Sequence, residues 1–230
     1  LDRFVPAHYD LYLDINRATK SIQGRTTVTG EAKAAHIALN QKFLNVTAVS
    51  VDGTAVPFDL DAEKETLEID LPTAGTVTVV IDYNTRLTDT MMGIYPSYYQ
   101  VDGQKKQLIG TQFETTFARQ AFPCVDEPAA KATFALAIKY DEQPGETIIA
   151  NMPEDHETAG VHYFQPTVKM STYLVAFAFG EMQKQVTTTK SGVQVGVFAT
   201  QAHQAKELTF ALDIAKRAIE FYEDFYQTPY

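Results

Sequence analysis

The feature that most constrains the fold is an alternation of apolar and polar side chains that recurs over the first 200 residues. It is clearest in four stretches, residues 9–15, 67–71, 77–83 and 134–140. A period of two puts one set of side chains on a buried strand face and leaves the other face exposed to solvent. Asp-Gly pairs at 52–53 and 102–103 separate strand-like runs and are good hairpin signals. These patterns predict a mainly β chain, an antiparallel saddle or sandwich.

Two other segments depart from this alternation. Residues 171–180 are apolar at both parities, so we expect a strand buried on both faces. In residues 203–226 the apolar positions recur every three or four residues, which predicts an amphipathic helix. The apolar stripe of this helix needs a partner, and we therefore expect it to open a second domain.

Charge and composition exclude several classes of protein. The formal net charge is −10 and the pI is about 4.9, so a nucleic-acid or anionic-membrane partner is not expected. The longest apolar run, residues 173–179, is far shorter than the roughly 20 residues of a membrane span. No signal peptide is visible, and the single Cys124 fits a reducing cytosol, so we expect a cytoplasmic protein. The missing initiator Met and the abrupt end suggest a piece of a longer protein.

Catalytic and metal-binding motifs are not found in the chain. No two of its five histidines stand at i and i+4, and His156-Glu157 is followed by Thr-Ala-Gly, so a second ligand of an HExxH motif is missing. There is no G-x-S-x-G and no phosphate-binding glycine loop. We expect the histidines to be surface or loop residues and Cys124 to be a small buried thiol. The chain alone assembles no recognisable chemistry.

One crowded segment, TQFETTFARQAFPCVDEPAAK (residues 111–131), stands out from the plain strand patterns. In a strand, Gln112 and Glu114 would share one face while Phe113 takes the other. An amide and a carboxylate side by side can accept several hydrogen bonds from one ammonium group. These residues alone leave two interpretations open, a cation site or a solvated strand carboxylate.

The second half of this segment is rich in charge. Arg119 is placed to pair with Asp126 or Glu127 across a turn that Pro123 and Pro128 stiffen.

Several motifs, in order, closely resemble the N-terminal domain of the aminopeptidase N family of zinc metallopeptidases. The resemblance runs from about residue 4 to residue 230 and looks most like the bacterial, cytosolic members. The segments that carry it are TQFETTFARQAFPCVDEPAAKATF (111–134), MMGIYPSYY (91–99), VKMSTYLVAF (168–177), KSGVQVGVFAT (190–200) and AIEFYEDFYQTPY (218–230).

The resemblance implies a β-saddle packed on a thermolysin-like catalytic domain, and it implies roles for individual residues. Glu114 matches the family's Glu that binds the free α-amine of the substrate, and Gln112 matches the Gln that lines the pocket for the first side chain. Arg119, Asp126 and Glu127 would support that site. The implied activity is the release of N-terminal amino acids from peptides, with peptides that carry a free N-terminus as partners.

The family's zinc helix, its third zinc ligand and its transition-state Tyr would all lie beyond residue 230. We therefore expect zinc in the full-length enzyme, no metal bound by this chain, and no activity of the chain alone. The expected domains are 1–194, the β-saddle, and 195–230, the start of a truncated catalytic domain that packs on its own remainder. A non-catalytic β-sandwich module for protein interaction is the alternative, although such a module has little reason to end on an amphipathic helix.

Overall fold

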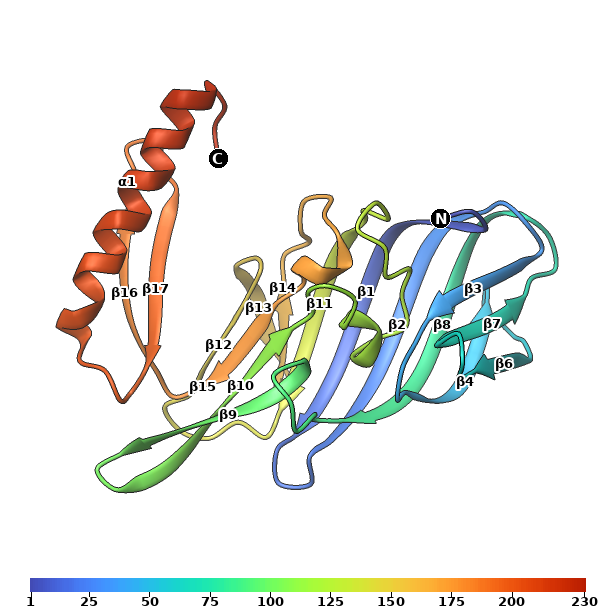
Figure 1. Cartoon of the computed structure of the whole chain (residues 1–230), viewed down its shortest axis with the longest axis horizontal. Coiled ribbons are helices and arrows are strands. Elements are labelled where there is room, and N and C mark those ends of the chain that lie inside the picture. The colour runs from blue at the N-terminus through green and yellow to red at the C-terminus, as the bar shows by residue number, and fades with distance from the viewer. The chain divides into compact units, whose positions relative to one another are not determined.

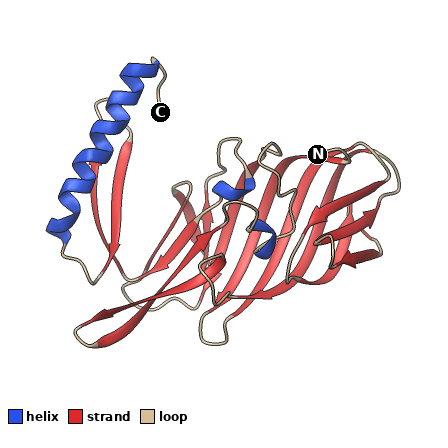
Figure 2. Cartoon of the chain, viewed as in Figure 1, coloured by secondary structure: helices blue, strands red, loops and turns tan.

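The structure is a computed structural model that describes all 230 residues, and most of them lie in β-strands (Figures 1 and 2). It divides into two compact units, each described by itself below. Unit 1 comprises residues 1–96, 109–142 and 148–178, and unit 2 comprises residues 97–108, 143–147 and 179–230. The mainly β fold predicted from the alternation is confirmed.

The largest sheet has eight strands and belongs to unit 1. In spatial order they are β13 (Glu154–Thr158), β14 (Val161–Phe164), β11 (Thr133–Tyr140), β1 (Phe4–Asn16), β2 (Ser21–Ala32), β8 (Gly75–Arg86), β4 (Asn45–Val51) and β5 (Thr54–Ala55). All neighbours pair antiparallel except β1 and β11, which are parallel. This parallel pair was not predicted, because strand patterns carry no information on strand direction.

Two smaller sheets contain three and four strands. A three-stranded sheet in unit 1 has the order β3 (His36–Asn40), β7 (Thr66–Asp70) and β6 (Phe58–Asp61). A four-stranded sheet has the order β12 (Thr147–Ala150), β15 (Phe177–Gly180), β10 (Gln104–Gln112) and β9 (Gly93–Val101). Both Asp-Gly hairpin predictions are confirmed: all four residues have positive φ, as a tight two-residue turn requires.

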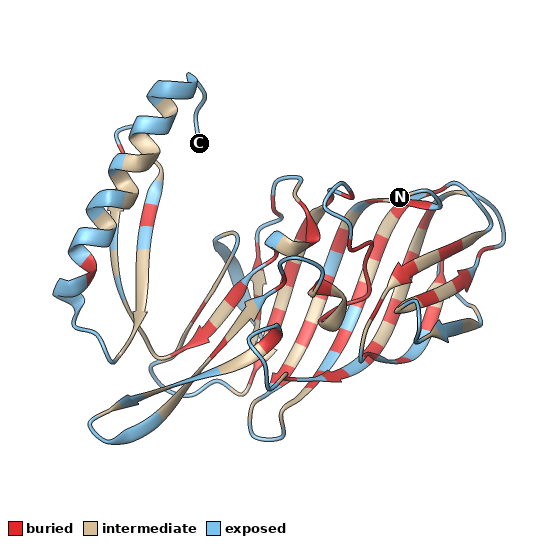
Figure 3. Cartoon of the chain, viewed as in Figure 1, coloured by how far each residue is buried: buried red, intermediate tan, exposed pale blue.

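The core of unit 1 follows from the alternation. Tyr9, Leu11, Leu13 and Ile15 of β1 are at most 3% exposed, whereas Asp10 between them faces solvent. Figure 3 shows this banding of buried and exposed residues along the strands. One glycine in the sheet is required by packing: a Cβ on Gly24 would lie 2.2 Å from Cζ of the buried Tyr83, its partner on β8.

Two predictions on local structure are wrong in part. Only Phe177–Gly180 of the segment 171–180 is a strand; Thr172–Leu174 form a short 3-10 helix, η2, and Leu174 is 46% exposed. The hydroxyl groups explain this, because Ser171 donates to the Pro128 carbonyl oxygen (2.6 Å) and Thr172 donates to a carboxylate described below. Among the histidines, His162 in β14 is buried rather than on the surface, and its Nδ1 lies 2.9 Å from Glu154 Oε1.

Unit 2 contains the hairpin β16 (Met182–Thr188) and β17 (Gln194–Thr200), followed by η3 (Ala205–Leu208) and the helix α1 (Thr209–Tyr226). The predicted helix is confirmed, although its first residues form the 3-10 turn. No residue of α1 is buried, and its aromatic side chains Phe210, Phe221 and Phe225 are 59–77% exposed. None of the helices combines the length and the apolar character that a membrane span requires. The predicted boundary between residues 194 and 195 stays a prediction.

Candidate functional site

The crowded segment follows the end of β10 and is anchored in the core by aromatic rings. Phe113 and Phe122 are 2% and 1% exposed, and their rings meet edge to face at 5.9 Å. Phe122 also contacts Tyr9 of β1 and Phe134 of β11. Aromatic packing of this kind fixes the two ends of the segment between Phe113 and Phe122 on the large sheet.

Two buried tyrosines of the large sheet hold the backbone of the same segment. The Tyr83 hydroxyl donates to the carbonyl oxygen of Ala121 (2.9 Å), and the Tyr9 hydroxyl accepts from the amide of Val125 (3.1 Å). Burial raises the pKa of both tyrosines, so the hydroxyl groups stay neutral at physiological pH.

Cys124 joins the segment to the three-stranded sheet through its backbone. Its amide and carbonyl groups bond to those of Asn40 at the end of β3 (3.1 and 2.6 Å). The side chain is fully buried, and burial together with the Asp126 charge raises the pKa of the thiol. The predicted buried thiol is confirmed, and a thiol in this state is a poor nucleophile.

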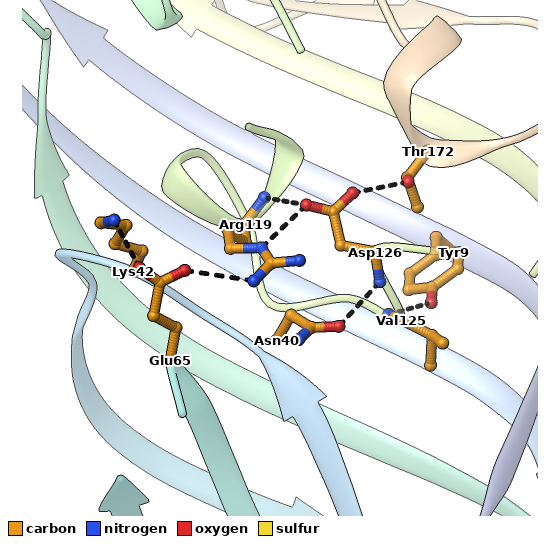
Figure 4. A network of polar contacts seen from close by, with 8 residues as sticks. All are labelled: Tyr9, Asn40, Lys42, Glu65, Arg119, Val125, Asp126 and Thr172. Atoms are coloured by element: carbon orange, nitrogen blue, oxygen red, sulfur yellow. Dashed lines mark hydrogen bonds and ion pairs between the residues drawn. The ribbon is translucent and has the colours of Figure 1, made fainter. Parts of the chain in front are cut away.

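The main polar contact of the segment is an ion pair between Arg119 and Asp126 (Figure 4). Arg119 Nε lies 3.0 Å from Asp126 Oδ2, and the two side chains are 15% and 1% exposed. On its other side, Arg119 Nη1 lies 3.1 Å from Glu65 Oε2, and Glu65 also pairs with Lys42. Lys42 and Arg119 together lower the pKa of Glu65, although its burial acts in the opposite direction.

The second carboxylate oxygen and the backbone amide of Asp126 also have hydrogen-bond partners. Its Oδ1 accepts from the Thr172 hydroxyl (2.8 Å), and its backbone amide donates to Asn40 Oδ1 (3.0 Å). Asp126 therefore links three parts of the chain that are distant in sequence. A buried carboxylate is tolerated only with partners of this kind.

Glu127 does not take part in this network. Its side chain is 53% exposed, and its Oε1 atom lies 3.0 Å from the amino group of Leu1. Of the two pairings considered for Arg119, the structure contains the one with Asp126. Sequence reasoning missed Glu65, Lys42 and Thr172, because each is remote in sequence and no local pattern marks it.

Gln112 and Glu114 lie at the end of β10, but they do not share a strand face as expected. The strand ends at Gln112, and Glu114 belongs to a turn that the Phe117 amide closes on the Phe113 carbonyl oxygen (2.9 Å). The peptide bond between Glu114 and Thr115 is cis. Both side chains are exposed and neither makes a hydrogen bond or ion pair within the chain, so both are free to bind a ligand.

The chain contains no group of three or more His, Cys, Asp or Glu side chains arranged to hold a metal ion. The segment presents the unpaired Glu114 carboxylate on a turn and the Gln112 amide at the end of β10, on either side of the buried Phe113.

Comparison with known proteins identifies the family of the chain. The profile of the peptidase M1 N-terminal domain matches residues 5–174, so the chain belongs to that family. Similar proteins include aminopeptidase N of Lactobacillus delbrueckii subsp. lactis, 62% identical over 229 residues, which cover 100% of this chain and 27% of the relative. Aminopeptidase N of Lactococcus lactis subsp. cremoris is 54% identical over 230 residues, with the same coverage.

A more distant relative is endoplasmic reticulum aminopeptidase 1 of Mus musculus, 35% identical over 252 residues that cover 98% of this chain and 26% of the relative. The chain thus spans about a quarter of the length of the curated relatives that it matches. The resemblance inferred from the sequence motifs is confirmed at the level of the family.

Proposed function

We propose that this chain is the N-terminal, substrate-recognising part of a zinc-dependent aminopeptidase that releases N-terminal amino acids from peptides. Glu114 binds the free α-ammonium group of the substrate, and Gln112 lines the pocket for its first side chain. The observation that carries the proposal is the exposed, unpaired Glu114 carboxylate on a turn anchored by Phe113. The aminopeptidase names of the relatives support it.

Glu114 would act by orientation rather than by chemistry. A carboxylate that accepts charge-assisted hydrogen bonds from an ammonium group fixes the first residue of the peptide and so sets which bond is cleaved. Arg119, Asp126 and their partners keep the turn in place, and Glu127 on the neighbouring surface would contribute least. Zinc and the general base would come from outside residues 1–230, so the isolated chain is expected to be inactive.

The rest of the catalytic domain is the second partner in this proposal. The exposed aromatic side chains of α1 supply a surface for it. A cytoplasmic location is part of the same proposal and rests on the resemblance to cytosolic family members; fractionation of cells that produce the intact protein would test it.

The test of Glu114 uses the intact enzyme and a substrate with a free α-amine, alanine p-nitroanilide. Loss of a charge-assisted hydrogen bond predicts that Glu114→Gln lowers kcat/KM by about 10- to 100-fold. Glu157→Gln is a matched control, because Glu157 is an exposed glutamate whose side chain forms no hydrogen bond or ion pair. The zinc content should be unchanged in both variants. Full activity of Glu114→Gln would refute the role of Glu114.

A further inference from the structure

The solvent-facing side of the large sheet carries a continuous row of six residues, one from each of six adjacent strands. Each residue is the direct backbone partner of the next, from β13 at one edge to β8. The row reads His156, Tyr163, Ala137, Tyr12, Arg25 and Asp82. It lies on the face opposite the core, since the neighbours of Tyr12 on β1, Leu11 and Leu13, are buried.

The orientation of one ring in this row is fixed by its neighbour. The Tyr163 ring stacks on the His156 ring with a centroid distance of 4.6 Å and an interplanar angle of 11°. Because His156 covers one face of the tyrosine, the other face is turned along the row toward Ala137. A methyl side chain at Ala137 leaves the space beside that ring open.

Tyr12 bounds the opposite side of this space. It lies two strands from Tyr163, which corresponds to roughly 9.6 Å at the spacing of adjacent strands. A ring placed between Tyr12 and Tyr163 would make one van der Waals contact of about 3.5–4.0 Å with each side chain, and the two contacts together fit within this span. A hollow of about 250 Å³ occupies this position, with Ala135 and Ala137 in its floor.

A second hollow of about 490 Å³ adjoins the first and shares Tyr12 and Arg25 with it. Arg25 forms a bidentate pair with Asp82, Nε to Oδ1 at 2.6 Å and Nη2 to Oδ2 at 3.0 Å. This pair holds the guanidinium group in place and leaves its Nη1 group free to donate. Asp10 and Thr27 add an acceptor and a hydroxyl group at the edge of the first hollow.

We propose that this row is a binding site for a neutral saccharide, with one sugar ring held between Tyr12 and Tyr163. The C–H faces of a pyranose pack on aromatic rings, and its hydroxyl groups match the fixed donors and acceptors of Arg25, Asp82 and Asp10. This site is separate from the turn that carries Glu114, and the proposal does not depend on the peptidase function.

Other ligand classes fit less well. An anion would meet the Asp10 carboxylate and a chain of net charge −10. A peptide added as a strand needs a free sheet edge, whereas β14, β11, β1 and β2 all have partners on both sides. A lipid needs a continuous apolar surface, and this row alternates aromatic with charged side chains.

The test measures binding of three neutral probes, maltotriose, cellotriose and chitotriose, to the intact protein by calorimetry and ligand-observed NMR. We expect at least one of them to bind. Tyr163→Ala and Tyr12→Ala should each raise its dissociation constant by about tenfold, because each removes a stacking wall. Ala137→Leu, which fills the space without removing a wall, should do the same, and Tyr163→Phe should bind as the wild type does.

Tyr98→Ala is the matched control, because Tyr98 is an exposed tyrosine of unit 2 and should leave binding within twofold. Circular dichroism of each variant separates loss of binding from loss of fold. No binding of any probe at 10 mM, or binding that all three wall and floor variants leave unchanged, would overturn the proposal. If a cationic peptide such as oligolysine bound at the row and no saccharide did, the ligand would belong to another class and the saccharide proposal would be wrong.

Discussion

Asp126 and Thr172 share a hydrogen bond of 2.8 Å in which both side chains are buried, although the residues are 46 positions apart in sequence. The same carboxylate pairs with Arg119, so Asp126 holds the short 3-10 helix η1 (Ala118–Gln120), η2 and the end of β3 together. The stability of the region that carries Glu114 therefore depends on one buried charge.

Asp126→Ala removes that charge and leaves Arg119 only its outer partner, Glu65. We expect the free energy of unfolding to fall by about 3–5 kcal/mol, the usual effect of breaking a buried pair. Urea unfolding followed by circular dichroism measures it. Asp89→Ala is the control, because Asp89 pairs with Lys20 at the surface and should change little. Equal stability of the two variants would show that the buried pair is not needed.

Gly24→Ala should destabilise unit 1 through a steric clash. The added Cβ would lie 2.2 Å from Cζ of Tyr83, whose ring is held by its bond to Ala121. Overpacking of this kind costs about 1–3 kcal/mol. Gly110→Ala offers a control, because nothing lies within 4 Å of a Cβ there. The double variant Gly24→Ala/Tyr83→Phe tests whether loss of the hydroxyl group lets the ring move and relieves the clash.

His36 should make stability depend on pH. Its ring lies 2.7 Å from Asp70 Oδ1 and 2.8 Å from Glu68 Oε2, and these two carboxylates raise the pKa of His36 above its ordinary 6.5. A raised pKa means that the contribution to stability is complete below pH 6.5 and is lost as the pH rises through the folded-state value.

Glu68 limits the same contribution on the acid side. Burial raises the pKa of Glu68, but hydrogen bonds from Thr66 and His36 outweigh burial and leave the pKa lowered. The effect of His36→Gln on stability should therefore be largest near pH 5–6 and small at pH 8. An NMR titration should place the pKa of His36 above 6.5 and show a lower value in Asp70→Asn. An unshifted His36 would contradict this prediction.

Cys124 should be unreactive in the native protein. It is fully buried and its pKa is raised, so almost no accessible thiolate exists near pH 7 to 8. Ellman's reagent should titrate no thiol in the native protein and one thiol per chain in guanidinium chloride. Rapid native reaction would mean that the segment around Cys124, which is paired with Asn40, opens readily.

Much of the fold could be predicted because its signals are local. Alternation placed β1, β7, β8 and β11, the Asp-Gly pairs placed two hairpins, and helical spacing placed α1. The prediction of one strand over residues 171–180 was wrong in part, because hydrophobic periodicity takes only apolar side chains into account. It does not weigh the Ser171 and Thr172 hydroxyl groups, whose partners lie more than 40 residues away.

The candidate site was predictable in a different way. The identities of Gln112 and Glu114 came from motif resemblance, and their roles stay predictions. Their placement on a strand face was wrong, because the buried Phe113 and the turn that follows end β10 at Gln112. Glu65 and Lys42 approach Arg119 only through the fold of the three-stranded sheet, which no short motif encodes.

The parallel pairing of β1 with β11 has a consequence for synthesis of the protein. His8 and Thr133, partners in this pair, are separated by 125 residues. At a translation rate of 5–20 residues per second, β1 waits for about 6–25 s before its second neighbour leaves the ribosome. During that interval the β1–β2 hairpin exposes a long unpaired edge, an aggregation hazard that chaperones on the nascent chain could shield.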